Sequence, residues 1–408
     1  MRIASIGETD RGGAGLSALK LHNEFLLQGL ESKFYVNRKS QDFDDIVEVP
    51  NRKGKPSSPF RVGQYTLATT DVPFTTGLSC KCSHFLQNVW EKNDILLLRW
   101  SSVTVSDFMV STWSHRAKPV VWCLSDMAPL TGGCHYSMGC DRYQTACYPC
   151  PRIESGFQLP TQVMSRRLKL WEKITIVSPS KWLAKVAKES AIGKNHDIRV
   201  IRTGVELNVF KPYEKLAERN WLGLDNEKPV ILFGAASLND SRKGFKFLPE
   251  LINNLNEKFD LKDKYSVLVI GAGSPDLKQL DCDVHVTGHL TCREELAKAY
   301  SAADVTLLPY VEDNLPNVCL ESLSCGVPVV AFSIGGIPDV VIPGTNGELA
   351  RPFDVWDLTN RLVETINRKY SIESIREWSV DNIDIKDQAR QYKELFQELI
   401  SNVNNLNK

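Results

Sequence analysis

The 408-residue sequence lacks a long apolar run, and it lacks an excess of charge of either sign. No stretch approaches the ~20 consecutive apolar residues that a membrane-spanning helix needs. The N-terminal residues 1–7 turn polar too soon to form a signal peptide. The 49 basic residues balance the 49 acidic residues, so no overall field favours a polynucleotide partner. We therefore expect a cytoplasmic protein that does not bind nucleic acid.

The sequence also lacks the cysteine pattern of an oxidised, secreted scaffold. Its 11 cysteines are an odd number, and Cys123, Cys319 and Cys325 fall in apolar contexts where a reduced thiol packs as a small hydrophobe. Hydrophobic residues make up 42% and charged residues 24%, which is typical of a globular protein. The length suits two domains of about 200 residues each.

One basic, proline-rich segment, residues 50–59, is compatible with contact to acidic lipid head groups. A solvated loop is the more common structure for such a segment. Peripheral contact with the inner surface of the cytoplasmic membrane is therefore a prediction that rests on this segment alone.

Short apolar runs alternate with helical patterns along the chain, which predicts an α/β fold with parallel sheets. The domain boundary is expected near residue 208, because a Gly- and Pro-punctuated loop there precedes a fresh strand at residues 229–234. The apolar stripe in residues 385–400 predicts a helix that packs either on its own domain or back on the first one. Strands are expected at residues 2–7, 33–36, 94–100, 119–124, 174–177, 230–233, 265–270, 284–286 and 305–308.

An acidic cluster follows the predicted strand at residues 305–308. Asp313 and Glu321 are eight positions apart, which would place them within roughly 80° of one another on a helix. Ligands of open α/β sheets bind at the carboxyl ends of the strands, so the two carboxylates can grip two hydroxyl-bearing parts of one ligand. The alternative is a solvated helix start, since acidic residues favour the first turn.

Two other segments at predicted strand ends suit an anionic ligand. Arg242 and Lys243 follow the strand at residues 229–234 and would suit a diphosphate, with a pair of surface cations as the alternative. The run Gly12-Gly13-Ala14-Gly15 lies between a strand and a helix, where backbone N–H groups can face an anion. This run is not the full dinucleotide fingerprint, and a tight turn is the alternative.

Four cysteines, Cys134, Cys140, Cys147 and Cys150, lie within 17 residues in the spacing C-x5-C-x6-C-x2-C. A tetrahedral thiolate zinc site would order this long loop, and its role would be structural because four thiolates leave no open position. Only the last two cysteines have the spacing of a zinc knuckle. Free or redox-paired thiols are the alternative.

Taken in order, several segments resemble the glycosyltransferases of the GT-B architecture, specifically family 4. These are retaining nucleotide-sugar transferases of bacterial polysaccharide synthesis. The resemblance implies two doubly wound Rossmann-like domains facing a cleft, residues 1–208 for the acceptor and 209–384 for the nucleotide sugar. It also implies that the helix at 385–408 crosses back to the N-terminal domain. The matching segments are residues 12–15, 177–183, 202–206, 210–212, 242–245, 303–323 and 326–331.

The same resemblance implies roles for individual residues. Glu321 would bind the ribose hydroxyls, and Asp313, with Glu312 as a rival, would face the donor sugar. The family often has a histidine where this chain has Ser125, so acceptor chemistry would rest on Asp126 and backbone groups, or on His135. The implied catalytic residues are Asp313, Asp126 and Lys243. The implied donor-binding residues are Gly13, Arg242, Lys243, Glu312, Asp313, Asn314, Leu315, Asn317, Val318 and Glu321.

The resemblance therefore predicts a retaining, hexosyltransferase-type enzyme that moves a sugar from a nucleotide diphosphate sugar to a glycan or lipid-linked glycan acceptor. Such a reaction would serve surface polysaccharide synthesis and need no metal for catalysis, with zinc restricted to a structural site. One alternative is a sugar-nucleotide epimerase with the same fold. Another is a noncatalytic, zinc-stabilised binding module.

Overall fold

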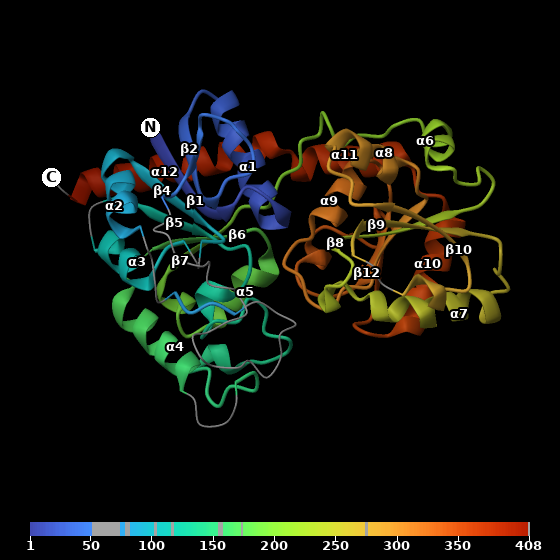
Figure 1. Ribbon diagram of the computed structural model, residues 1–408, viewed down its shortest axis with the longest axis horizontal. Helices are drawn as coiled ribbons and strands as arrows, with labels where there is room; N and C mark the ends of the chain where they lie inside the picture. Colours follow the sequence, from blue (N-terminus) through green and yellow to red (C-terminus); the bar gives the residue numbers. More distant parts are fainter. Residues whose placement is uncertain are drawn as a thin grey trace. The chain divides into compact units, whose positions relative to one another are not determined.

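The computed structural model divides the chain into two compact units (Figure 1). One unit is Met1–Thr203 with Lys386–Lys408, and the other is Gly204–Ile385, so the division falls before the predicted boundary at residue 208. Apart from Pro50, the basic segment at residues 50–59 lies outside the described residues, and its contact with a membrane stays a prediction. The structure describes residues 1–50, 74–77, 82–101, 104–115, 118–153, 158–172, 174–273 and 276–406.

The first unit is built on a seven-stranded parallel sheet with the order β3-β2-β1-β4-β5-β6-β7. Leu96 and Leu98 of the central strand pack with Trp113 and Trp122 in its core. The strands are β1 (Arg2–Thr9), β2 (Glu31–Arg38), β3 (Ile46–Glu48), β4 (Ile95–Arg99), β5 (Val120–Cys123), β6 (Thr175–Ser178) and β7 (Asp197–Val200). The helices are α1 (Gly12–Leu27), α2 (Ser83–Lys92), α3 (Asp107–Ser114), α4 (Leu159–Leu170) and α5 (Lys181–Glu189).

The C-terminal helix α12 (Ile385–Leu406) belongs almost entirely to the first unit. The ring of Phe25 in α1 lies 6.2 Å from the ring of Tyr392 and 5.9 Å from that of Phe396, measured between centroids. Both side chains of α12 are fully buried. The predicted return of this helix to the N-terminal domain is therefore confirmed (Figure 1).

The second unit is built on a six-stranded parallel sheet with the order β10-β9-β8-β11-β12-β13. Its strand order matches the first six strands of the other sheet, so both units are doubly wound, as predicted. The strands are β8 (Val230–Ser237), β9 (Ser266–Ala272), β10 (Asp283–Gly288), β11 (Val305–Leu308), β12 (Val329–Phe332) and β13 (Gly347–Ala350). The helices are α6 (Lys215–Leu222), α7 (Leu248–Lys258), α8 (Arg293–Ser301), α9 (Asn317–Ser324), α10 (Val355–Arg368) and α11 (Ile372–Ile383).

In each sheet the strand order reverses between two neighbouring strands, β1 and β4 in the first unit and β8 and β11 in the second. The loops after these strands diverge, which leaves a crevice outside the carboxyl ends where ligands of such sheets bind. This topology places the glycine run after β1, the Arg242-Lys243 pair after β8 and the acidic cluster after β11 at the carboxyl ends of the strands.

The glycine run after β1 differs from the prediction, because α1 begins at Gly12 and not after Gly15. The run therefore forms the first turn of the helix. A Cβ at Gly15 would lie 2.5 Å from the carbonyl oxygen of Thr9, so a glycine lets the helix pack directly on the strand end. Close packing within the protein thus accounts for at least one of these glycines.

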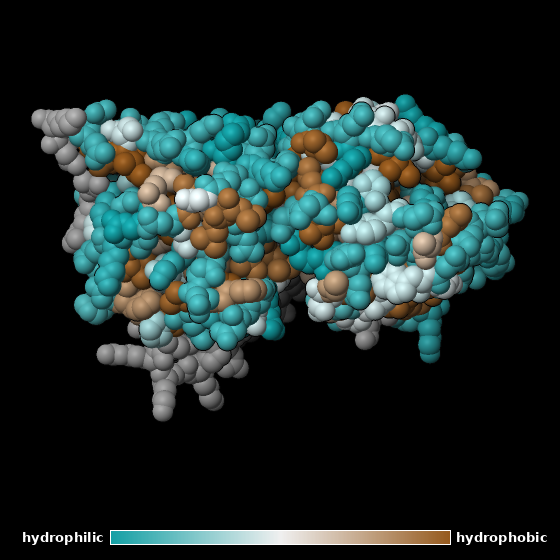
Figure 2. Space-filling model, turned by 90° about the horizontal axis from the view of Figure 1, so that it is seen from above, coloured by the Kyte–Doolittle hydropathy of each residue, from teal (hydrophilic) through white to brown (hydrophobic). Residues whose placement is uncertain are grey.

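The face drawn in Figure 2 is mostly hydrophilic, with hydrophobic residues in scattered patches. Among the described residues, none of the helices is both long enough and apolar enough to cross a membrane.

Candidate functional site

In the second unit, a cation from one strand end meets an anion from the neighbouring strand end. Lys243 lies in the single turn of 3-10 helix after β8, and Asp313 lies in the turn after β11. Lys243 Nζ is 2.5 Å from Asp313 Oδ2 and 4.2 Å from the centre of the Tyr310 ring. The side chains of Lys243 and Asp313 are only 16% and 11% exposed, so the pair is partly shielded from water. A partly shielded charge acts more strongly on a ligand than an exposed one.

The two turns that carry this pair are locked together by backbone contacts. The amide of Val311 donates to the carbonyl oxygen of Arg242 over 2.7 Å. Gly244 has a left-handed backbone (φ 72°), and a Cβ there would lie 1.8 Å from the carbonyl oxygen of Pro309. Arg242 is held by its neighbour Asp240, with Nη2 2.5 Å from Oδ2. The positions of Arg242 and Lys243 are therefore set before any ligand arrives.

The acidic stretch is not a solvated helix start. Glu312, Asp313 and Asn314 are buried, with 9%, 7% and 3% exposure. The helix α9 begins only at Asn317, after Pro316, because a proline disfavours helical backbone in the residue before it. The premise that Asp313 and Glu321 share one helix was therefore wrong, since Asp313 lies in the preceding turn.

Glu321 lies in the second turn of α9, and its carboxylate accepts a hydrogen bond from the hydroxyl of Tyr300 over 3.2 Å. Burial and the nearby Glu321 carboxylate raise the pKa of Tyr300 well above its usual value, so the phenol stays a neutral donor. Of the other predicted donor residues, Asn317 and Val318 form the first turn of α9 and Leu315 packs in the core of the unit.

In the first unit, a buried carboxylate and imidazole form a pair after β5. Asp126 Oδ2 is 2.5 Å from His135 Nδ1, and the amide of Ala128 donates to Asp126 Oδ1 over 2.9 Å. His135 Nε2 is 3.1 Å from the hydroxyl of Thr75. The two residues expected as alternatives on the acceptor side are thus brought together, and both are buried, at 5% and 2% exposure.

Sequence reasoning missed Trp100, which follows β4 and approaches the same histidine. Its Nε1 lies 3.3 Å from His135 Nδ1, and its backbone is left-handed (φ 41°), which is uncommon for a bulky residue. Such a conformation costs energy and is found most often at functional sites. The one feature of the sequence that could have identified Trp100 is its position directly after a central strand.

A second residue that sequence reasoning missed holds the start of the loop after β5. Arg167 of α4 is buried, and its Nη1 donates to the carbonyl oxygens of Ala128 and Thr131 over 2.6 and 2.8 Å. Its Nε donates to Asp107 Oδ1 over 3.1 Å. A charge-assisted network of this kind fixes the backbone next to Asp126.

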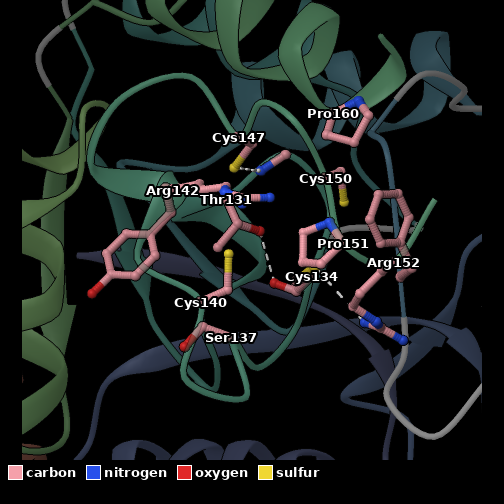
Figure 3. A pocket seen from close by; sticks show the side chains of 13 residues that line it. Thr131, Cys134, Ser137, Cys140, Arg142, Cys147, Cys150, Pro151, Arg152 and Pro160 are labelled. Carbon is pink, nitrogen blue, oxygen red and sulfur yellow. Dashed lines mark hydrogen bonds between the residues drawn. The ribbon is translucent and has the colours of Figure 1, made fainter. Parts of the chain in front are cut away.

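The four clustered cysteines, Cys134, Cys140, Cys147 and Cys150, line one small cavity in this loop (Figure 3). Burial raises the pKa of the Cys134 thiol to about 12 and that of the Cys147 thiol to about 11. Both are therefore protonated near neutral pH when no metal is bound.

The predicted site residues thus form a group in each unit. Asp126, His135 and the first turn of α1 with Gly13 belong to the first unit, and the remaining donor-binding residues belong to the second. Within the second unit, Lys243 and Asp313 are in direct contact.

Comparison with known proteins supports this architecture. The sucrose-phosphate synthase of Thermosynechococcus elongatus superposes with a TM-score of 0.67 at 18% identity, covering 98% of this chain and 99% of that one. HepE of Anabaena in complex with UDP-glucose superposes with a TM-score of 0.67 at 15% identity, covering 98% and 100%. The chain has the GT-B fold, as the sequence predicted.

The match to a family model lies in the second unit. Residues 228–368 match the family model described as glycosyl transferases group 1. The D-inositol 3-phosphate glycosyltransferase of Mycobacterium sp. (strain KMS) is 31% identical over 183 residues, and that of Mycolicibacterium smegmatis is 28% identical over 186 residues. Each match spans 42% of this chain and 40% of the relative's length. The resemblance to GT-B glycosyltransferases is confirmed, while membership of family 4 stays a prediction.

Proposed function

We propose that the protein is a glycosyltransferase that moves a sugar from a nucleotide diphosphate sugar to a hydroxyl group of a glycan or lipid-linked glycan. The observation that carries this proposal is the contact between Lys243 and Asp313 across the point where the strand order reverses. One structural relative supports the donor class, since HepE of Anabaena was solved with UDP and with UDP-glucose.

The donor diphosphate would lie against the turn after β8 and the N-terminus of α9. The N–H groups of the first turn of α9 would donate to the diphosphate oxygens, and Arg242 and Lys243 would add two positive charges nearby. Glu321 would accept hydrogen bonds from the ribose hydroxyls, held in place by Tyr300. Asp313 would face the donor sugar while keeping Lys243 in position, with Glu312 beside it.

The reaction would break the bond between the anomeric carbon and the phosphate oxygen and form a bond from the same carbon to the acceptor oxygen. Negative charge grows on the leaving diphosphate, and preorganised cations stabilise that charge in the transition state. We propose a same-face displacement that retains the anomeric configuration, in which the leaving phosphate takes the acceptor proton. The catalytic step would then need no metal ion. Asp126, with His135, would orient the acceptor hydroxyl.

A pair of lysine variants tests the assignment. Lys243→Ala should reduce transfer more than about 100-fold, because loss of one preorganised donor to a developing anion costs about that much. Lys246→Ala is the matched control, since Lys246 is an exposed lysine three positions away. Isothermal titration with UDP and with a panel of nucleotide sugars identifies the donor, and proton NMR of the product reads the anomeric configuration. Equal turnover in Lys243→Ala and the parent protein would contradict the assignment of Lys243 to the donor site.

The same assays separate the proposal from an epimerase of the same fold. A transferase releases nucleoside diphosphate in proportion to added acceptor, whereas an epimerase converts one nucleotide sugar into another without an acceptor. Inversion at the anomeric carbon would leave the transferase assignment intact and overturn the proposed same-face displacement.

A further inference from the structure

The loop that carries His135 has little regular structure to hold it. Between Thr131 and Ile153 it contains a single 3-10 turn, Arg142–Gln144. Its own apolar cluster consists of Phe74 and Ile153 with a few partly buried neighbours. Even so, Cys134, Cys140, Cys147 and Cys150 are all at least partly buried. Tyr143 packs in the main apolar cluster of the unit, with Cys147 against it, but the other residues of 137–150 are partly or fully exposed. A bound metal would therefore add stability that the apolar core does not supply to this segment.

The four cysteine side chains surround one cavity of about 30 Å³ (Figure 3). This is room for an occupant the size of a water molecule or an ion. The cysteines come from separate parts of the loop, yet all reach the same space. In the placement that the structure describes, no three His, Cys, Asp or Glu side chains lie close enough together to enclose a metal. The four cysteines line the cavity, and metal binding requires their sulfur atoms to approach one another more closely.

Two features around the cavity suit thiolate sulfur. The amide of Gly132 donates to Cys147 Sγ over 3.2 Å, and Arg152 Nη1 lies 3.7 Å from Cys134 Sγ. Donors that point at ligand atoms orient them and stabilise their negative charge.

The backbone of Cys147 is a further indication that its side chain is required. Its φ is 52°, a left-handed conformation that glycine or asparagine adopts at less cost. The backbone conformation alone would favour glycine or asparagine here. A cysteine at this position is therefore explained by a role of its sulfur atom, such as metal binding.

We propose that Cys134, Cys140, Cys147 and Cys150 bind one divalent metal ion of the zinc class in a closed, structural site that holds the loop and so keeps His135 against Asp126. The four thiols release their protons to water on binding, and no electron is transferred. His135 directly follows Cys134 in the chain, and its imidazole is the loop's contact with Asp126. Metal binding would therefore be coupled to the geometry of that buried pair.

Metal content is the first test, and it needs no substrate. The full-length protein, purified with a reductant and without added metal, should carry about one equivalent of zinc by elemental analysis. The double variant Cys147→Ser, Cys150→Ser should lose it, whereas Cys292→Ser should keep it, because Cys292 is an exposed cysteine outside the loop. Cobalt substitution should give the absorption bands of tetrahedral thiolate coordination in the parent and not in the double variant.

A protein without metal that fails to bind zinc or cobalt overturns the proposal, as does a mass two hydrogens below the reduced value that reports a disulfide in this loop. Removal of metal with a chelator should lower the melting temperature by roughly 5 °C or more. It should also speed amide exchange at residues 131–153, while UDP binding in the second unit is retained. Loss of UDP binding without loss of metal would count against the proposed function alone, so the two failures are distinguishable.

Discussion

The two units share one strand order but form their candidate sites in different ways. In the second unit, short turns after β8 and β11 touch each other and bring Lys243 and Asp313 together. In the first unit, a long loop after β5 folds back so that His135 reaches Asp126. The sheet therefore supplies the location in both cases, and the loops supply the chemistry.

The two pairs also differ in how much of their charge is accessible. The side chains of Lys243 and Asp313 are 16% and 11% exposed, whereas those of His135 and Asp126 are 3% and 7% exposed. A ligand can thus meet the charged pair of the second unit more readily than the pair of the first. The second unit is suited to an anionic ligand as it stands, while the first depends on its loop.

The most damaging change should be one that separates the two turns of the second unit. In Gly244→Ala, the new Cβ would overlap the carbonyl oxygen of Pro309, 1.8 Å away, in addition to the strain of a left-handed alanine. We expect a loss of about 3–5 kcal/mol in the free energy of unfolding, together with loss of UDP binding.

Gly223→Ala is the matched control, because Gly223 is equally left-handed (φ 68°) and a Cβ there would meet nothing within 4 Å. It should lose only about 1–2 kcal/mol. Urea denaturation of both variants measures the difference. Equal losses would show that the contact between the turns contributes little.

A smaller effect is expected in the first unit. Asp126→Asn keeps the shape of the side chain but removes the charge that holds His135. Transfer should fall about 100-fold, the scale of an orienting or general-base contribution. Affinity for UDP should stay the same, because the donor residues apart from Gly13 lie in the other unit.

Steady-state kinetics with UDP titration in parallel separates these effects. Ser125→Ala serves as the neighbouring control, and it should retain most of the turnover. Weakened UDP binding in Asp126→Asn would contradict the division of roles between the units.

The parallel sheets could be predicted from the sequence because buried parallel strands are continuous apolar runs. A helix start such as that of α5 has a local signal, because its N-cap Ser180 accepts a hydrogen bond from the amide of Leu183. The strands β3 and β13 and the helices α10 and α11 were not predicted. The three residues of β3 form an edge strand, which is too short to show a period.

The candidate site was predictable in composition more than in geometry. Motif resemblance singled out Lys243 and Asp313, but not that they form an ion pair, because the contact depends on two turns that are 70 positions apart. His135 was named only as an alternative to Asp126. Trp100 and Arg167 belong to no motif, so a contact seen only in the folded chain was needed to find them.

Removal of the hydrogen bond that holds the Glu321 carboxylate should have a modest effect on UDP affinity. Tyr300→Phe removes the hydroxyl that donates to the Glu321 carboxylate over 3.2 Å and leaves the ring in place. A hydrogen bond to a charged group contributes about 1.5–3 kcal/mol, and partial compensation should leave a loss of about tenfold in UDP affinity.

Tyr213→Phe is the control, since Tyr213 is a partly buried tyrosine of the same unit whose hydroxyl donates to the backbone oxygen of Val209 over 3.4 Å. Isothermal titration with UDP and with uridine locates the loss on the ribose. An unchanged affinity for both ligands would remove Tyr300 from the binding site.

The smallest effect concerns how each unit responds to pH. In the first unit, burial lowers the pKa of His22 below its usual 6.5, although its contact with Asp45 opposes this shift. Above pH 6.5 both the folded and unfolded states carry a neutral imidazole, so the stabilising effect is complete. As the pH falls below 6.5, the unfolded state takes up a proton before the folded state does, and stability is lost. Burial lowers the pKa of His196 in the same unit, with the same consequence.

Amide exchange between about pH 7.5 and 5.5, corrected for its intrinsic pH dependence, should therefore show a loss of protection in the first unit that is reduced in His22→Gln. His285→Gln in the second unit is the control, and an equal change in all three proteins would contradict the assignment to His22.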